Sequence, residues 1–366
     1  LDTEENATFN VHYIDLDYDL SQVFFITTAN SAQNIPSALF DRMEILELPS
    51  YLEGEKLHIA REFLLPRQWK QHGLLPSNME IGDGAIKEII RSWTHESGVR
   101  DLERQIAALC RKTAIRIVED GSPENACIRI TSDDLETYLG VRKYHDDERE
   151  TSALTGVAAG LAYTGAGGSL LYIESTVMPG SGKLQVTGKL GDVMKESAHA
   201  ALSYIRSRSS RLGLRPDFYK DVDIHVHVPE GAVPKDGPSA GITLATSLAS
   251  ALLGIPVKSD VCMTGELTLR GRVLPIGGLR EKLLAAQRTG MKTVLLPDGN
   301  RKDLSEVPDE IVSSLDIHFV SEADNVLTLA MDAPAEDIFS GEASEALLRS
   351  LRVPRTLGGD LNGAVL

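Results

Sequence analysis

One serine lies in surroundings that favour covalent chemistry. Ser239 belongs to the segment Pro-Lys-Asp-Gly-Pro-Ser-Ala-Gly (234–241), and an apolar run over 242–254 that predicts a helix follows directly. A helix start presents unpaired backbone N–H groups and the positive end of the helix dipole, which can stabilise an oxyanion. The same position suits a serine that only caps the helix. The segment by itself therefore leaves both a nucleophile and a cap open.

Lys282 is one candidate base for such a serine. It lies in a predicted helix over 279–289, and its neighbours three or four positions away are small or apolar, namely Gly278, Leu279, Ala285 and Ala286. Burial among such neighbours lowers the pKa of an ammonium group toward the range in which a base works. Arg280 has similar neighbours but cannot release its proton. A lysine that keeps its amine in solvent is the alternative that this helix leaves open.

A histidine pair offers the second candidate base. Residues 222–228 alternate between Val or Ile and polar side chains, which predicts a strand with Asp223, His225 and His227 on one face. A Ser-His-Asp arrangement is compatible with this pattern. Two histidines on the polar face of a half-exposed strand are also common as plain surface residues.

Three regions of different pattern surround these residues. The apolar run Val23–Ile26 predicts a buried strand, and Asn30 follows it, where α/β folds place ligand contacts and where turns also favour asparagine. Residues 51–140 carry stripes with a 3.6-residue period and predict a helical domain with its own core. A charged stretch over 143–150 separates it from alternating strands and helices, which predict an α/β domain.

Composition narrows the class of protein. A chain of 366 residues predicts two or three domains, and its net charge of −16 gives no overall attraction for nucleic acid or anionic lipid. Three widely spaced cysteines favour neither a disulfide framework nor a zinc site and indicate a reducing compartment. No apolar run reaches the length of a membrane span. The start, Leu1-Asp2 with no initiator Met, suggests a piece of a longer protein.

Motifs in a fixed order carry a family resemblance. The Ser239 segment, then Thr264-Gly-Glu266, then the Gly-Gly-Leu-Arg-Glu-Lys-Leu-Leu-Ala-Ala stretch over 277–286 closely resemble the proteolytic domain of Lon proteases, which are ATP-dependent serine peptidases with a Ser-Lys dyad. The preceding part resembles the end of that family's AAA+ ATPase module through Asp19-Leu-Ser21, Thr28-Ala-Asn30, Asp41-Arg-Met-Glu44, Glu55-Lys56-x-x-Ile59-Ala60, Leu64-Leu-Pro66, His72-Gly73-Leu74 and Ser97–Arg104. The resemblance covers residues 8 to about 335.

The resemblance implies a fold of class α/β plus all-α. Its expected parts are a remnant of the AAA+ large domain at 1–48, a small helical AAA+ domain at 49–143, a linker at 144–149, an α/β Lon-type protease domain at 150–335 and a C-terminal tail at 336–366. It also implies a hexameric ring whose chamber degrades unfolded, misfolded or regulatory proteins. We expect the bacterial cytoplasm as the location, with the mitochondrial matrix as the alternative.

The resemblance also assigns roles in proteolysis. Ser239 matches the nucleophile and Lys282 the general base, and Thr264 matches the threonine that supports the lysine by hydrogen bonding. Asp236 matches an aspartate that can pair with the lysine in inactive states. The dyad needs no cofactor, and no structural metal is expected.

Three further residues match the family's nucleotide-sensing positions. Asn30 resembles the sensor-1 asparagine, Arg42 the arginine finger and Arg100 the sensor-2 arginine, which together imply ATP and Mg²⁺ as cofactors of the full-length protein. The Walker A loop and the Walker B strand are expected before residue 1. The stretch Gly180-Ser-Gly182-Lys183 is not a Walker A loop, because Val177 and Leu184 replace the required Gly and Ser or Thr. We therefore expect peptidase chemistry from this chain but no ATP hydrolysis.

Two other functions stay open. One is an ATP-driven remodelling or repair ATPase with a related carboxyl half, and the other is a non-enzymatic fragment that binds nucleotide or assembles rings. Repair ATPases of this relationship lack the catalytic serine, so the presence of Ser239 together with Lys282 argues against the first. A covalent probe for reactive serines would separate the three.

Overall fold

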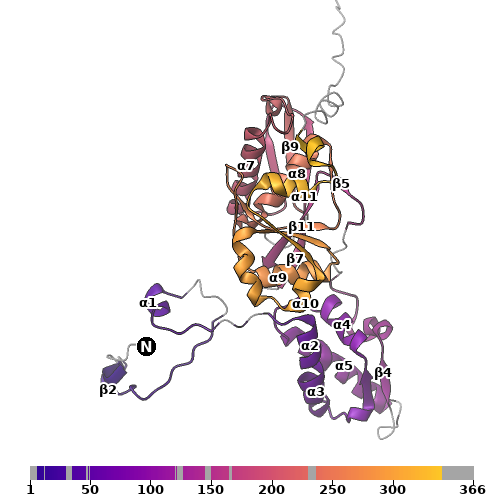
Figure 1. Cartoon of the computed structure of the whole chain (residues 1–366). Coiled ribbons are helices and arrows are strands. Elements are labelled where there is room, and N and C mark those ends of the chain that lie inside the picture. The colour runs from indigo at the N-terminus through magenta and orange to yellow at the C-terminus, as the bar shows by residue number, and fades with distance from the viewer. Residues whose placement is uncertain are drawn as a thin grey trace, which may run out of the picture. The chain divides into compact units, whose positions relative to one another are not determined.

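The structure is a computed structural model that describes residues 6–11, 13–29, 35–46, 48, 50–119, 121, 127–144, 150–164, 167–229 and 236–339. The chain divides into two compact units, Leu1–Pro49 and Ser50–Leu366. Ribbons for both are drawn in Figure 1. In the described parts no helix is long and apolar enough to cross a membrane.

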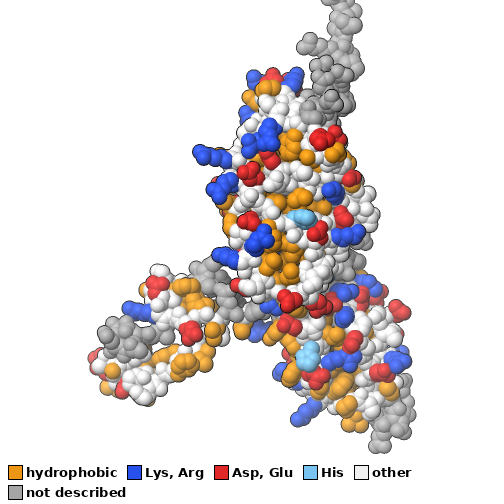
Figure 2. Space-filling model, viewed as in Figure 1, with side chains coloured by type: hydrophobic (Ala, Val, Ile, Leu, Met, Phe, Trp, Pro, Cys, Tyr) orange, Lys and Arg blue, Asp and Glu red, His pale blue; other side chains and the backbone are white. Residues whose placement is uncertain are grey.

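The described residues of the first unit contain little regular structure. A short 3₁₀ turn (η1, Asn6–Thr8) leads into β1 (Phe9–Val11), which pairs in antiparallel fashion with β2 (Leu16–Tyr18), and α1 (Ser37–Phe40) follows. The strand predicted over Val23–Ile26 is wrong: these residues have no regular structure, and Phe24 is 87% exposed. A buried strand needs neighbouring strands for its backbone groups, and no described residue of this unit pairs with it. Figure 2 shows hydrophobic side chains along the surface of the unit.

The second unit begins with a helical body. Its helical segments are α2 (Glu53–Ile59), a π-helical turn η3 (Ala60–Leu64), α3 (Leu65–Gln71), α4 (Asp83–Ser92), α5 (Arg100–Glu119) and α6 (Leu135–Leu139), with 3₁₀ turns η4 (Pro76–Asn78) and η5 (Ser132–Asp134). Two short strands, β3 (Met79–Ile81) and β4 (Ile128–Ile130), pair in parallel. The predicted separate core is confirmed, since Trp93, Leu102 and Ile106 belong to a buried cluster of this body.

A seven-stranded mixed sheet forms the centre of the α/β body. The strand order is β15-β14-β11-β6-β7-β9-β8, made of β6 (Val157–Thr164), β7 (Gly167–Pro179), β8 (Leu184–Thr187), β9 (Val222–His227), β11 (Val261–Met263), β14 (Thr293–Pro297) and β15 (Asp316–Val320). β6 with β7 and β7 with β9 pair in antiparallel fashion, whereas β6, β11, β14 and β15 run parallel and β8 runs parallel to β9. Short pairs lie outside the sheet, namely β5 (Leu154–Thr155) with β10 (Pro256–Val257) and β12 (Glu266–Leu267) with β13 (Val273–Leu274).

Helices cover both faces of this sheet. Alternate residues of one strand enter different clusters: Met263 packs in the core with α7 (Asp192–Ser207), α8 (Gly241–Leu253) and α11 (Ala323–Ala330), while Cys262 packs with α9 (Leu279–Arg288) and α10 (Asp309–Ser314). The remaining segments are the helix α12 (Ala335–Phe339) and the 3₁₀ turns η6 (Phe218–Lys220), η7 (Pro238–Ala240) and η8 (Asp298–Glu306). The predicted combination of a helical body and an α/β body is confirmed (Figure 1).

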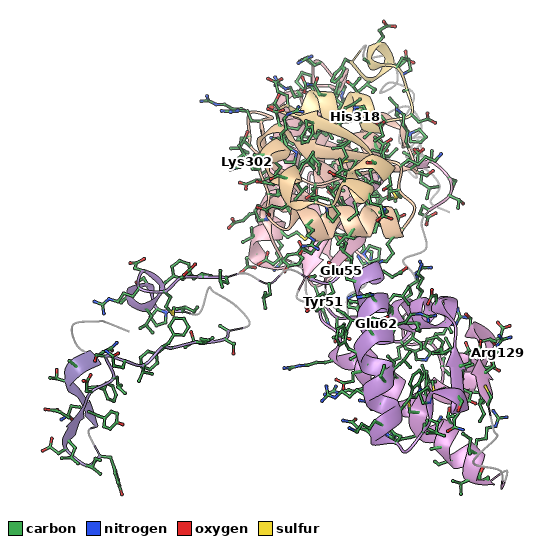
Figure 3. All side chains as sticks on the ribbon, turned by 60° about the horizontal axis from the view of Figure 1, so that its bottom comes forward. Tyr51, Glu55, Glu62, Arg129, Lys302 and His318 are labelled. Carbon is green, nitrogen blue, oxygen red and sulfur yellow. The ribbon has the colours of Figure 1, made fainter. Side chains whose placement is uncertain are left out.

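Charged side chains lie on the outside of both bodies. Figure 3 shows Glu62 and Arg129 on the helical body and Lys302 on the α/β body, and all three are exposed. On the face shown in Figure 2, acidic and basic groups alternate over the α/β body.

Candidate active site

A tight turn places Ser239 at the start of a buried helix. Ser239 is half-buried in η7, and α8 follows at once with each of its residues buried. Gly237 opens the turn with φ 135°, a conformation that favours glycine. The Ser239 carbonyl accepts a hydrogen bond from the Gly265 N–H at 2.8 Å, so the turn is tied to the segment after β11. The predicted helix start after Ser239 is confirmed.

Lys282 reaches the same place from the opposite face of the sheet. Its side chain is 2% exposed, and its Nζ donates to Thr264 Oγ1 at 3.1 Å. Thr264, itself fully buried, donates through Oγ1 to the Ser239 carbonyl at 3.3 Å. Two consecutive hydrogen bonds therefore link the lysine to the turn of the serine.

Burial controls the protonation of this lysine. Removal of the ammonium from water lowers the pKa of Lys282 to about 8 from its ordinary 10.5. Arg280, two residues earlier on α9, faces elsewhere and lies 3.8 Å from the Glu55 carboxylate. The amine of Lys282 can therefore be neutral in a substantial fraction of molecules slightly above neutral pH.

Asp236 contacts a helix rather than the lysine. Its Oδ1 accepts hydrogen bonds from the backbone N–H groups of Met194 and Gly237, each at 3.0 Å. The pairing with Lys282 that the family resemblance implies for inactive states stays a prediction.

The histidine pair has its own partner. The alternation predicted for β9 is confirmed, because Val222, Ile224 and Val226 are buried on the other face of the strand. His225 Nε2 and His227 Nδ1 lie 2.9 Å and 2.7 Å from Thr187 Oγ1 on β8. Both imidazoles are thus engaged with the neighbouring edge strand.

The glycine-rich stretch before β8 has a structural role. Asp223 accepts hydrogen bonds from the backbone N–H groups of Ser181 and Lys183 at 2.8 Å each, and these bonds lower the pKa of Asp223. A Cβ atom at Gly180 would lie 2.2 Å from Asp223 Cγ. This stretch therefore wraps a carboxylate of its own chain, which agrees with its rejection as a Walker A loop.

The expected nucleotide-sensing residues lie in different parts of the chain. Arg100 begins α5 and lines an open hollow of about 510 Å³, whose other lining residues are Gln68, Gln71, His72, Glu103, Arg104, Ala107 and Arg111. Arg42 is exposed just after α1 in the first unit, and Asn30 lies outside the described residues.

Sequence reasoning missed two features of these sites. Arg104 and Arg111 line the same hollow as Arg100, and their positions four and eleven residues after Arg100 on one helix were a usable signal. The contact of Asp236 with Met194 had no sequence signal, because the two residues are far apart in the chain.

No group of three or more potential ligands that could hold a metal ion occurs in the described part of the chain. The three cysteines are free, with Cys110 and Cys262 buried and Cys127 exposed.

Two family models match the chain. Residues 129–333 match the C-terminal proteolytic domain of Lon protease (S16), and residues 70–126 match the lid domain of the Lon protease AAA+ ATPase. The Lon protease of Nitratidesulfovibrio vulgaris is 61% identical over 360 residues, which cover 98% of this chain and 44% of that protein. The Lon protease of Escherichia coli K12 is 53% identical over 331 residues (90% and 42%), and Lon protease 1 of Thermus thermophilus is 54% identical over 329 residues (90% and 41%).

The α/β body and these matches define the class of the protein, a serine peptidase of the Lon type. The chain belongs to the Lon protease family. It spans less than half the length of the curated relatives it matches.

Proposed function

We propose that the chain hydrolyses peptide bonds with Ser239 as nucleophile and Lys282 as general base. The observation that carries the proposal is the buried Lys282 amine, 3.1 Å from a threonine hydroxyl that is itself bonded to the backbone of Ser239. A base works best when its pKa lies near the operating pH, and a lysine with a pKa of about 8 meets this condition.

The proposed reaction has two stages. The neutral Lys282 amine takes the Ser239 hydroxyl proton while Oγ attacks the carbonyl carbon of the substrate. The C–N bond then breaks, the departing amine takes the proton from Lys282, and an acyl-enzyme ester remains. In the second stage Lys282 takes a proton from water, the resulting hydroxide attacks the ester, and Ser239 regains its proton.

Thr264 and the Ser239 turn complete the proposed machinery. Thr264 orients the Lys282 amine in both protonation states, since its oxygen accepts from either form. The N–H groups of Gly241 and Ile242 at the start of α8 donate to the Pro238 and Gly265 carbonyls, so we propose that N–H groups of the Ser239 turn itself stabilise the oxyanion of each tetrahedral intermediate.

We further propose an ATP-dependent endopeptidase for the full-length protein, acting on unfolded, misfolded or regulatory proteins as a cytoplasmic hexamer. Arg100 would contact nucleotide phosphate at the lid, and the hollow that it shares with Arg104 and Arg111 fits an anionic group. Asn30 and Arg42 keep their proposed sensing roles. ATP supplies the free energy for substrate unfolding when it is bound.

The present chain carries no Walker A motif, so we propose that it cleaves peptides without hydrolysing ATP. The proposed boundaries are an AAA+ large-domain remnant at 1–48, the helical lid at 49–143, a linker at 144–149, the protease domain at 150–335 and a tail at 336–366.

Labelling with a fluorophosphonate and a peptide boronate tests the dyad. We expect covalent label on Ser239 by peptide mapping, cleavage of an unstructured protein at equal rates with and without ATP, and loss of both in Ser239→Ala. Activity retained by Ser239→Ala would refute the nucleophile. ATP hydrolysis that disappears in Arg100→Ala would contradict the proposed lack of ATPase activity.

A further inference from the structure

The helix α7 starts without a capping side chain of its own. Its N-cap residue is Gly191, which offers no side-chain acceptor to the first turn. The N–H of Met194, three residues further, is the group that an N-cap side chain normally binds. Asp236 binds it instead through Oδ1 at 3.0 Å, so a residue from the segment before Ser239 caps this helix.

Gly191 leaves the space that the Asp236 side chain occupies. A Cβ atom at residue 191 would lie 2.2 Å from Asp236 Cγ and 2.6 Å from Asp236 Cβ. The second distance involves an atom that side-chain rotation cannot move. An alanine at this position would therefore displace the Asp236 backbone, and with it the segment that leads to Ser239.

The turn of Ser239 is held on its other side by the segment after β11. The Gly265 N–H donates to the Ser239 carbonyl at 2.8 Å, and the Ile242 N–H donates to the Gly265 carbonyl at 3.1 Å. On the N-terminal side of Ser239, the hydrogen bond from the Met194 N–H to Asp236 fixes the chain. Between the two lie Gly237 and Pro238, whose backbone has little freedom once both ends are fixed.

We infer that Gly191 and the first turn of α7 form a seat for Asp236, and that this seat positions Ser239 for attack. Gly191 and Asp236 are positioning residues in this scheme, since neither needs to touch the substrate. The carboxylate also lies at the positive end of the α7 dipole, where a negative charge is favoured. The inference rests on the proposed role of Ser239.

The acidic residue in the first turn of α7 has a partner of its own. Asp192 in the first turn of α7 pairs with Lys195 at 3.1 Å and is exposed. The pKa of Lys282 is lowered by its burial, and Asp236 contacts the Met194 N–H rather than this lysine. The seat therefore acts through position rather than through the protonation of the lysine.

A double-mutant cycle tests the seat, with the rate of fluorophosphonate labelling at Ser239 as the readout. We expect Gly191→Ala and Asp236→Ala each to slow labelling by about 10²-fold, the scale of a misplacement of about 1 Å. The double variant should slow labelling by less than the product of the two single effects, because the bond to Met194 can be lost only once, although the clash between the Cβ atoms of residues 191 and 236 persists. Asp236→Asn, which keeps an oxygen acceptor, should recover most of the rate lost in Asp236→Ala.

Gly82→Ala is the matched control. Gly82 is the N-cap of α4 with the same extended backbone conformation as Gly191, but the space beside it is open. We expect this variant to label at the wild-type rate. Additive effects of Gly191→Ala and Asp236→Ala, or equal slowing in Gly82→Ala, would overturn the inference.

Amide hydrogen exchange at Met194 separates this inference from the proposed function. Gly191→Ala and Asp236→Ala should both expose the Met194 amide, whereas Gly82→Ala should leave it protected. Unchanged protection in Gly191→Ala would overturn the seat even if Ser239 proves reactive. If the wild-type chain failed to label, the dyad would be wrong, and exchange at Met194 would still decide whether the seat exists.

Discussion

Replacing Lys282 by methionine should stabilise the protease domain at neutral pH while it removes peptidase activity. Methionine has a similar length and flexibility and carries no charge. In the wild-type protein the side chain is 2% exposed, and burial lowers its pKa from 10.5 to about 8. The folded state therefore bears the cost of a buried charge wherever the lysine is protonated.

The size and the sign of the effect follow from that difference. Each pKa unit corresponds to about 1.4 kcal/mol, so the buried charge costs about 3 kcal/mol at pH 7, where the lysine is protonated in the folded and unfolded states alike. The cost falls to about 2 kcal/mol at pH 9 and vanishes above about pH 10.5, where both states are neutral. In the methionine variant the loss of the hydrogen bond to Thr264 lowers the free energy of unfolding by about 1 kcal/mol. The net increase in the free energy of unfolding at pH 7 is therefore about 2 kcal/mol.

Urea denaturation of both proteins at pH 7, 8 and 9, followed by pulsed hydrogen exchange at backbone amides of the α/β body, measures the difference. We expect the Met variant to unfold at a higher urea concentration, with an advantage that shrinks as the pH rises. A Met variant that is less stable than wild type at pH 7, or an advantage that is independent of pH, would refute burial as the cause of the lowered pKa.

Three other predictions address the dyad. The rate of Ser239 acylation should rise with pH through about 8 as Lys282 becomes neutral. The variants Lys282→Arg and Lys282→Ala should both be nearly inactive, because neither side chain can accept the proton. If the arginine variant kept more than about a tenth of the wild-type kcat/KM, a loss of transition-state stabilisation below about 1.4 kcal/mol, the lysine would be an electrostatic support only. His225→Ala and His227→Ala should leave Ser239 reactive in labelling assays, whereas a loss of about 10³-fold in a folded variant would favour a Ser-His mechanism. Thr264→Val should slow acylation by about 10-fold or more and lower the free energy of unfolding by about 1–3 kcal/mol, because the buried Lys282 amine loses its acceptor. Unchanged acylation kinetics would show that Thr264 has no part in the mechanism.

Local patterns predicted the elements that hold the site. The apolar run after Ser239 became a helix, the alternation over 222–228 became a strand with one buried face, and the Lys282 stripe became α9. These patterns succeed because the periods of helices and strands follow from backbone geometry within a few residues.

The same reasoning failed where a segment depends on distant partners. Val23–Ile26 has the composition of a buried strand but is exposed, since no described strand of its unit pairs with it. Composition reports what a segment could bury, whereas pairing decides whether it does.

The sequence by itself determined the family, the separation into a helical body and an α/β body, and the candidates Ser239 and Lys282. It left the base undecided among the lysine and two histidines. Only the tertiary structure placed the histidines on Thr187, buried the lysine beside Thr264 and set Asp236 on α7. The physical reason is that desolvation and hydrogen-bond partners depend on contacts between strands and helices that are far apart in the sequence. The local periodicity of a segment carries no information about those contacts.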